Sequence, residues 1–244
     1  MIDFSRRRSL GLIMGGLTLA YPRAAPALVR SFVAFGDSYT HSFRNGIPSW
    51  ADQISASGAA KLLVNLAFSG ATTAGLNGRR TFDGQIDDWV ANHRSKGLPD
   101  RTVVYFGYND IAPDNQALSP AMIQYRVCID RLISYGVTQG SRRMILCLLH
   151  DWSRNPTHKI TARSRVQAWN QYVAYLAVTR TNITTVNLFA RLEDVYRNKA
   201  AYGFINVSDP DKARSATSYL YADINHFGRK GQAIIANEIR PKLL

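Results

Sequence analysis

The sequence predicts an α/β fold, a three-layer α/β/α sandwich with a five-stranded parallel sheet. Apolar, β-rich runs recur along the chain, and tens of residues separate each run from the next. Such intervals are long enough for a crossover helix. Segments with a helical pattern fill them, and this alternation is typical of a parallel sheet covered on both faces. Because crossovers are almost always right-handed, strands and helices of this order form a sandwich.

The expected elements follow one another in a regular order. The strands are expected at residues 31–35, 61–67, 101–106, 143–149 and 183–188. The helices are expected at residues 48–57, 83–93, 120–135 and 162–178, with a last one after Gly228.

A serine directly follows the first expected strand, in the run Phe35-Gly36-Asp37-Ser38-Tyr39. The turn at the end of a buried strand is where α/β folds present nucleophiles. Glycine, aspartate and serine are also ordinary turn residues, so this triplet alone carries little information.

Three further motifs follow in order. Gly70 lies in a small-residue loop after the second strand, where its backbone can approach a ligand closely. Asn109 follows the third strand, and Asp223 precedes His226 by three residues, a spacing that on a helical turn places a carboxylate beside an imidazole. Since open α/β sheets bind ligands at the carboxyl edge of their strands, Ser38, Gly70 and Asn109 are expected at one place.

The sequence resembles the SGNH hydrolases, also called the GDSL lipase/esterase family, whose four named residues are a serine, a glycine, an asparagine and a histidine in this order. The matching positions are Ser38, Gly70, Asn109 and His226. The stretches 47–50, 82–86 and 202–207 look like the lipase-like branch of the family, and the resemblance spans residues 32–239. It implies a flavodoxin-like version of the sandwich.

The resemblance implies an ester hydrolase that forms an acyl-enzyme and needs no cofactor. Ser38 would be the nucleophile, His226 its general base and Asp223 the carboxylate that orients the imidazole. The backbone N–H groups of Ser38 and Gly70 and the side-chain amide of Asn109 would form the oxyanion hole. Fatty-acyl or short-acyl esters are the expected substrates, either small molecules or lipids.

Other residues near these motifs have competing interpretations. Asp37 and Asp110 are expected to cap helices or to satisfy turn amides, and Asn225 is expected to be a turn residue. His150 and Asp151 follow the fourth strand as a rival acid/base pair. Because the family places its last block near the C-terminus, we expect His150 and Asp151, with Trp152, to line the pocket for the acyl or alcohol group.

Two departures from the family pattern concern the shape of the pocket. Tyr39 replaces the leucine of the family motif, which is expected to narrow the entrance. Phe227-Gly228 follows His226, where lipase-like members commonly have a proline and a small polar residue.

Aromatic residues around the motifs suit a lipidic or aryl ester and equally suit core packing: Phe43, Trp50, Phe68, Tyr108 and Trp152. The alternatives to a simple esterase are a polysaccharide O-deacetylase, an acyltransferase, or a non-catalytic protein that binds the cell envelope.

The N-terminal residues have the pattern of a cleavable export signal. Arg6, Arg7 and Arg8 precede an uncharged apolar segment at 11–21 and a small-residue site ending at Ala27. Both a twin-arginine and a Sec signal fit, and the segment is too short for a membrane-spanning helix. We expect residues 1–27 to be removed and residues 28–244 to form one exported domain, periplasmic or secreted by a bacterium, without a transmembrane segment.

The chain is strongly basic, with a formal net charge of +13. Such a charge attracts anionic partners, but the basic residues are scattered and no nucleic-acid-binding motif accompanies them. We therefore expect no nucleic-acid partner, while attachment to an anionic envelope surface stays open. Cys128 and Cys147 have no metal-ligand spacing, so no metal is expected, and both a disulfide and two free thiols are compatible with their apolar contexts.

Overall fold

The computed structural model describes residues 29–42, 46–73, 75, 80–112, 117–157, 163–211 and 218–244. The predicted export signal and Phe43 lie outside these ranges. None of the described helices is long and apolar enough to cross a membrane.

The predicted five-stranded parallel sheet is confirmed, with the strand order β2-β1-β3-β4-β5. The strands are β1 (Ser31–Gly36), β2 (Lys61–Asn65), β3 (Arg101–Tyr105), β4 (Arg143–Leu148) and β5 (Ile183–Asn187). Strand β2 ends two residues earlier than expected. The side chain of Asn65 there donates to the Thr40 carbonyl (2.8 Å) and accepts from Ala67 N (3.2 Å), which turns the chain out of the sheet.

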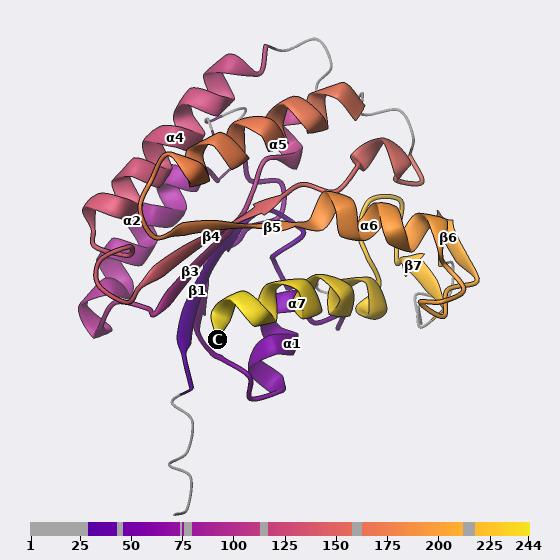
Figure 1. The fold of residues 1–244 in the computed structure, drawn as a ribbon, viewed down its shortest axis with the longest axis horizontal. Helices are drawn as coiled ribbons and strands as arrows, with labels where there is room; N and C mark the ends of the chain where they lie inside the picture. Colours follow the sequence, from indigo (N-terminus) through magenta and orange to yellow (C-terminus); the bar gives the residue numbers. More distant parts are fainter. Residues whose placement is uncertain are drawn as a thin grey trace, which may run out of the picture.

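Helices cover both faces of the sheet, as predicted (Figure 1). One face carries α2 (Phe82–Asn92), α4 (Ser119–Ser134) and α5 (Arg163–Val178), and the other carries α1 (Trp50–Ala56) and α7 (Arg229–Leu243). Strand β3 is buried along its whole length, which is expected for a central parallel strand.

Capping residues set the first turns of α1 and α2. Ser49 accepts from Asp52 N, while the Asp52 carboxylate accepts from Ser49 N, which is a capping box. The Thr81 hydroxyl accepts from Gly84 N and starts α2 at Phe82. Both helices therefore begin where a side chain satisfies the free N–H groups of the first turn.

The structure also contains elements around the sheet that no sequence pattern predicted. These are α3 (Tyr108–Ile111), α6 (Leu188–Arg197), the 3₁₀ turns η1 (Arg94–Lys96) and η2 (Trp152–Arg154), and a parallel pair of β6 (Asn206–Pro210) and β7 (Tyr219–Tyr221). Leu188 was expected to end a strand but begins α6. The Asn187 side chain caps that helix by accepting from Ala190 N at 2.9 Å.

A buried glutamine holds the end of β1. The Gln85 side-chain amide pairs with the backbone of Gly36, accepting from its N–H (3.1 Å) and donating to its carbonyl (2.8 Å). A Cβ on Gly36 would lie 2.5 Å from Thr40 Oγ1 and 2.6 Å from the Tyr105 carbonyl oxygen, so only glycine fits this crowded position. Ser38 follows two residues later, so the position of its turn is set by the fixed backbone of Gly36.

Replacing Gln85 by alanine should lower the free energy of unfolding by about 1–3 kcal/mol, because the buried N–H of Gly36 loses its side-chain acceptor and the Gly36 carbonyl keeps only the bond from Phe68 N (3.1 Å). Chemical denaturation of the two proteins measures the difference. Gln171→Ala, on the exposed face of α5, is the matched control and should change stability by no more than about 0.5 kcal/mol. Equal stability of the Gln85 variant and the control would contradict this role.

Candidate active site

Ser38, Gly70 and Asn109 lie at the carboxyl edge of the sheet, as predicted. They follow β1, β2 and β3, which are adjacent parallel strands. Residues 37–41 form a tight turn, in which the Asp37 carbonyl accepts from Thr40 N (3.1 Å) and His41 N (3.0 Å). Ser38 is 8% exposed in this turn.

The buried carboxylate of Asp37 connects two of these loops. It accepts from Tyr39 N in its own turn (3.1 Å) and from Tyr108 N at the start of α3 (3.3 Å). Burial raises the pKa of Asp37 to about 7, although the two N–H donors lower it, Asp110 raises it further and His226 lowers it. A carboxyl group with this pKa exchanges its proton near neutrality.

Asp110 and Asn109 connect α3 to the loop that carries Gly70. Asp110 accepts from Thr73 N (2.9 Å) and from the Thr73 hydroxyl (2.7 Å), while Asn109 Nδ2 donates to the Ala71 carbonyl (2.9 Å). The prediction that Asp37 and Asp110 satisfy turn amides is therefore confirmed. Thr73 is a positioning residue that no sequence motif indicated.

Gly70 adopts the left-handed conformation, with φ of +77°. A Cβ at this position would meet no atom within 4 Å, so backbone conformation rather than crowding requires glycine here. The open space beside Gly70 leaves its surroundings free for an approaching ligand.

Asp223 and His226 are paired, but the backbone around them differs from the expectation. Residues 222–226 form an irregular turn, not a helical turn. The Asp223 carboxylate builds this turn by accepting from Asn225 N (2.8 Å) and His226 N (2.7 Å). His226 Nδ1 lies 2.9 Å from Asp223 Oδ2 and 3.0 Å from Oδ1.

The charge state of Asp223 sets the tautomer of His226. Burial by itself raises the pKa of Asp223, but the hydrogen bond and charge of His226, together with the two backbone donors, bring the net pKa below its ordinary value. An ionised Asp223 accepts the proton of Nδ1, which leaves Nε2 of a neutral His226 as a proton acceptor.

Tyr39 joins the serine turn to the histidine turn. Its hydroxyl donates to the Asn225 carbonyl, and its ring centroid lies 5.7 Å from that of His226. Asn155 Nδ2 donates to the same carbonyl at 3.1 Å and to the Tyr39 hydroxyl at 3.0 Å. We call Tyr39, Asn155 and Asn225 the Tyr39 clamp.

The contacts of the Tyr39 clamp bear on two expectations, one for Tyr39 and one for Asn225. Tyr39 is 1% exposed and points into the protein, so it does not narrow the entrance. Asn225 is a turn residue, as predicted, but its carbonyl is also the point at which the two turns meet. Asn155 lies in a loop without a recognisable motif, so the sequence contained no signal for its part in the clamp.

His150 and Asp151 do not line a pocket, because both are buried. The His150 ring packs among those of Tyr39 (4.9 Å), Tyr108 (4.9 Å) and Phe227 (4.6 Å), and burial lowers its pKa to about 3. Asp151 is paired with Arg163. The expected pocket role of His150 and Asp151 is therefore wrong, and both are structural.

Phe227 follows His226, where lipase-like members commonly have a proline, and its ring packs in the same aromatic cluster as His150. It is fully buried between Tyr39 and Tyr221, with ring centroids 5.4 and 5.1 Å away. Its backbone bridges to Tyr221, which fixes the chain directly after His226.

The other aromatic residues divide between core and surface. Trp50 and Tyr108 are core residues, and Trp152 is 8% exposed with its indole N–H on the Tyr39 hydroxyl (3.0 Å). Phe68 is 39% exposed two residues before Gly70, and the Arg80 guanidinium lies 4.7 Å above its ring. Among the described members of the set, Phe68 is thus the one that a substrate can reach.

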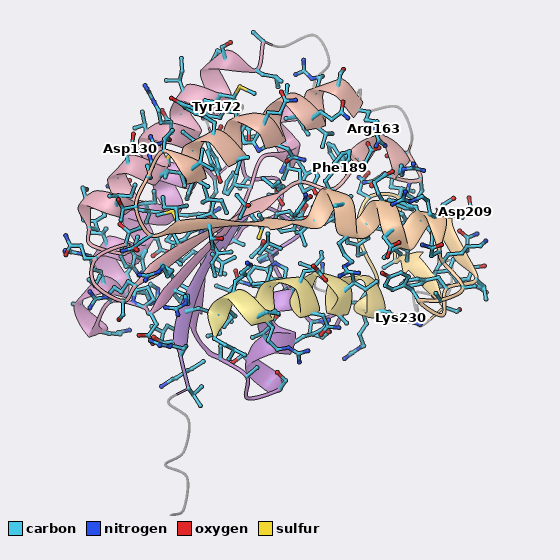
Figure 2. The ribbon with its side chains drawn as sticks, in the orientation of Figure 1. Asp130, Arg163, Tyr172, Phe189, Asp209 and Lys230 are labelled. Carbon is cyan, nitrogen blue, oxygen red and sulfur yellow. The ribbon has the colours of Figure 1, made fainter. Side chains whose placement is uncertain are left out.

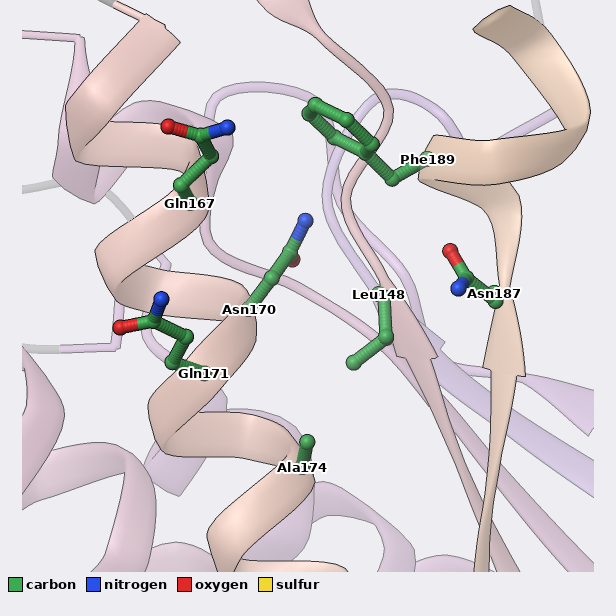
Figure 3. Close-up of a pocket in the computed structure, with 7 residues that line it drawn as sticks. All are labelled: Leu148, Gln167, Asn170, Gln171, Ala174, Asn187 and Phe189. Atoms are coloured by element: carbon green, nitrogen blue, oxygen red, sulfur yellow. The ribbon is translucent and has the colours of Figure 1, made fainter.

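A cavity of about 350 Å³ lies away from Ser38, between α5 and the ends of β4 and β5 (Figure 3). Side-chain amides dominate its lining: Gln167, Asn170 and Gln171 on α5 face Asn187 and Phe189 across the opening. Arg163 stacks on Phe189 at 4.8 Å (Figure 2). A lining of neutral amides suits an uncharged polar molecule.

The two cysteines are free thiols and buried, so the structure contains no disulfide between them. Burial raises the pKa of the Cys128 thiol to about 12 and that of Cys147 still further. Within the described ranges, no cluster of three or more histidine, cysteine, aspartate or glutamate side chains could hold a metal ion.

Asp37 should make stability depend on pH. Its folded pKa of about 7 exceeds the ordinary 3.8, so its contribution is complete below about pH 4 and decreases as the pH rises towards 7. Between those limits the free energy of unfolding of the wild type should fall relative to that of Asp37→Asn, by on the order of 1 kcal/mol per pH unit. Urea titrations at several pH values measure the difference, and parallel curves would contradict the raised pKa.

Comparisons with known proteins agree with the fold and with the family that the sequence resembles. The family described as GDSL-like lipase/acylhydrolase matches residues 34–234. No curated protein matches the chain.

Solved structures share this fold at low sequence identity. An acetyl xylan esterase is 16% identical with a TM-score of 0.60, over 88% of this chain and 100% of that one. A lipase/acylhydrolase from Enterococcus faecalis is 19% identical (TM-score 0.53; 88% and 97% covered), and an acetylxylan esterase from Geobacillus stearothermophilus is 16% identical (TM-score 0.57; 88% and 94% covered). With the family match over most of its length, the chain belongs to the GDSL-like lipase/acylhydrolase family and is a carboxylic ester hydrolase.

Proposed function

We propose that this hydrolase cleaves esters through a triad of Ser38, His226 and Asp223. The observation that carries the proposal is the Asp223–His226 pair, held against the turn of Ser38 by the Tyr39 clamp. Serine needs a neighbouring base at neutral pH, and a neutral imidazole whose Nδ1–H is bonded to a carboxylate is such a base.

In the first half of the reaction, Ser38 Oγ attacks the ester carbonyl carbon and gives its proton to His226 Nε2. The tetrahedral intermediate collapses, and the alcohol leaves with that proton. In the second half, His226 takes a proton from water, the hydroxide attacks the acyl-enzyme, and the acid leaves as Ser38 recovers its proton. Asp223 stabilises the imidazolium in both halves and keeps its charge.

The oxyanion would be bound by the N–H groups of Ser38 and Gly70 and by the Asn109 amide. One N–H of that amide is bonded to the Ala71 carbonyl, and the amide carries a second. Asp37 and Asp110 hold the loops of these donors in place before substrate arrives. Such preorganisation makes each donor worth about 10²- to 10³-fold in rate.

Short-acyl esters are the substrates we favour, and carbohydrate esters are the second candidate within this class. The acetyl xylan esterases among the structural neighbours favour a polysaccharide O-deacetylase. Fatty-acyl esters and acyl transfer to an acceptor other than water use the same site chemistry. A non-catalytic envelope-binding role is less favoured, because the Asp223–His226 pair and all three oxyanion donors are retained.

We also propose that the protein is exported to the periplasm or secreted. The support is the arginine-rich, apolar, small-residue pattern of residues 1–27, followed by one domain at 28–244.

Ser38→Ala should lower the hydrolysis of p-nitrophenyl acetate by at least about 10³-fold, because no other nucleophile replaces the hydroxyl. The series from acetate to palmitate, together with acetylated xylo-oligosaccharides, measures the preferred acyl length and the alcohol. Ser95→Ala, an exposed serine in η1, is the matched control and should keep full activity. Turnover that persists in the Ser38 variant would refute the triad.

Tyr39→Phe should lower kcat by about tenfold while leaving KM nearly unchanged, because the Asn225 carbonyl beside His226 loses one of its two donors but the substrate surface is untouched. Steady-state kinetics and the rate of Ser38 labelling by an organophosphate measure the effect. The matched control is Tyr196→Phe, which removes a hydroxyl bonded to Tyr221 at the far side of the same cluster and should leave kcat unchanged. Equal effects of the two changes would show that Tyr39 only fills space.

A further inference from the structure

The cavity between α5 and the ends of β4 and β5 opens at the same edge of the sheet as Ser38, and we call it the amide cavity. Leu148 is the last residue of β4 and Asn187 the last of β5, and both line it. Strand β4 adjoins β3, which Asn109 follows. With neighbouring strands about 4.8 Å apart, β5 lies roughly 14 Å from β1, so the amide cavity and Ser38 share one face of the molecule.

The described lining of the amide cavity contains no charged side chain. Three other cavities among the described residues, of about 180, 310 and 250 Å³, are each lined by an arginine: Arg240, Arg154 and Arg94. The guanidinium of Arg163, which stacks on Phe189 at the rim of the amide cavity, is already paired with Asp151 and with Glu193 (3.2 Å). A charged ligand would therefore find no free partner of opposite charge in this lining.

The fold uses only part of the hydrogen-bonding capacity of the amides. Asn170 accepts from Leu149 N (2.7 Å) and donates to the Leu149 carbonyl (2.7 Å), which fixes its side chain and leaves it one N–H. Asn187 Oδ1 caps α6, which leaves Nδ2. Within the described part of the chain, neither Nδ2 of Asn187 nor the Gln167 amide has a hydrogen-bond partner. Donors and an acceptor that the fold does not need thus meet at one opening.

Phe189 adds an aromatic surface to this opening. Figure 3 shows Asn170 pointing from α5 towards the Phe189 ring, with Gln167 on the same side of the opening and Asn187 on the side of Phe189. The stacked Arg163 holds the ring in place at 4.8 Å. The amide cavity therefore combines neutral hydrogen-bonding groups with one ring face.

A sugar ring matches both properties. Each sugar hydroxyl donates and accepts, as a side-chain amide does, and the C–H groups of the sugar pack on the electron-rich face of an aromatic ring. An acyl chain fits poorly, because it would take the amides out of water without replacing their hydrogen bonds. An extended peptide also fits poorly, because 350 Å³ is at the lower end of the size of ligand cavities, about 300–1,000 Å³, and holds a compact group.

We propose that the amide cavity binds one sugar residue of a neutral glycan and so holds an acylated glycan at the edge of the sheet that carries Ser38. The role in catalysis rests on the carbohydrate-ester activity proposed above, whereas the binding itself needs no reaction at Ser38. The cavity shares no residue with the triad or with the oxyanion donors.

The test is calorimetric titration of the full chain with two unacylated neutral glycans, xylotetraose and chitotetraose. The wild type should bind at least one of them, and Ser38→Ala should bind it equally well. The test variant combines Gln167→Ala with Asn187→Ser, because serine still caps α6 but lacks the amide. Its affinity should fall by about tenfold for the two lost hydrogen bonds. Ala174→Phe, which places a ring inside the cavity (Figure 3), should abolish binding.

The matched control variant is Gln139→Ala with Asn92→Ser, which removes two exposed amides near the opposite edge of the sheet. It should bind the glycan as the wild type does. For an acetylated form of the glycan that binds, the test variant should raise KM by about tenfold and leave kcat unchanged. Its hydrolysis of p-nitrophenyl acetate should equal that of the wild type, which also shows that the variant is folded.

Three results would overturn the proposal: binding of neither glycan, equal losses in the test and control variants, or equally tight binding of an end-blocked tetra-alanine peptide. Failure of the proposed function gives a different result. Turnover that persists in Ser38→Ala would refute the triad and leave the glycan titrations unaffected. Hydrolysis of p-nitrophenyl acetate without glycan binding would refute the sugar subsite alone.

Discussion

The hydrogen bond from the Tyr39 hydroxyl to the Asn225 carbonyl is the contact on which the candidate site depends. Ser38 follows β1, the first strand in the chain, and His226 lies just before α7, the last helix. Because they are so far apart in the sequence, no local interaction can set the distance between them. Tyr39 adjoins the serine, Asn225 adjoins the histidine, and the clamp fixes one relative to the other. Gln232 strengthens the connection by donating to the Tyr39 carbonyl at 3.3 Å.

The polar side chains buried around Tyr39 are hydrogen-bonded to one another, apart from Nε2 of His150. The hydroxyl of Tyr221 donates to Asn155 (2.8 Å), which in turn donates to Tyr39, and the His150 ring closes the cluster from the other side. Burial keeps Tyr39 and Tyr221 neutral by raising their pKa, and it keeps His150 neutral by lowering its pKa. Tyr39, Tyr221 and His150 are therefore uncharged, and Asp223 is the charged partner of His226.

The two edges of one parallel sheet have different chemistry for a single geometric reason. Every strand starts at one edge and ends at the other, so residues that precede strands gather together, as do residues that follow them. The carboxyl edge collects Ser38, Gly70 and Asn109, while the amino edge collects basic residues whose hydrogen bonds go to main-chain carbonyls.

The sequence by itself determined the sheet, its helices and the order of the four motif residues, because apolar periodicity and strand ends are local properties. It also identified Asp223 and His226 as partners, since they are three positions apart in the sequence. Only the tertiary structure decided that Tyr39 points inward, that Asn155 supports the Asn225 carbonyl, and that His150 and Asp151 are buried. It also decided that some of the scattered basic residues, such as Arg101 and Arg143, meet where neighbouring strands begin. Each of these depends on contacts between segments far apart in the chain, and side-chain direction and burial there are set by packing that no local pattern encodes.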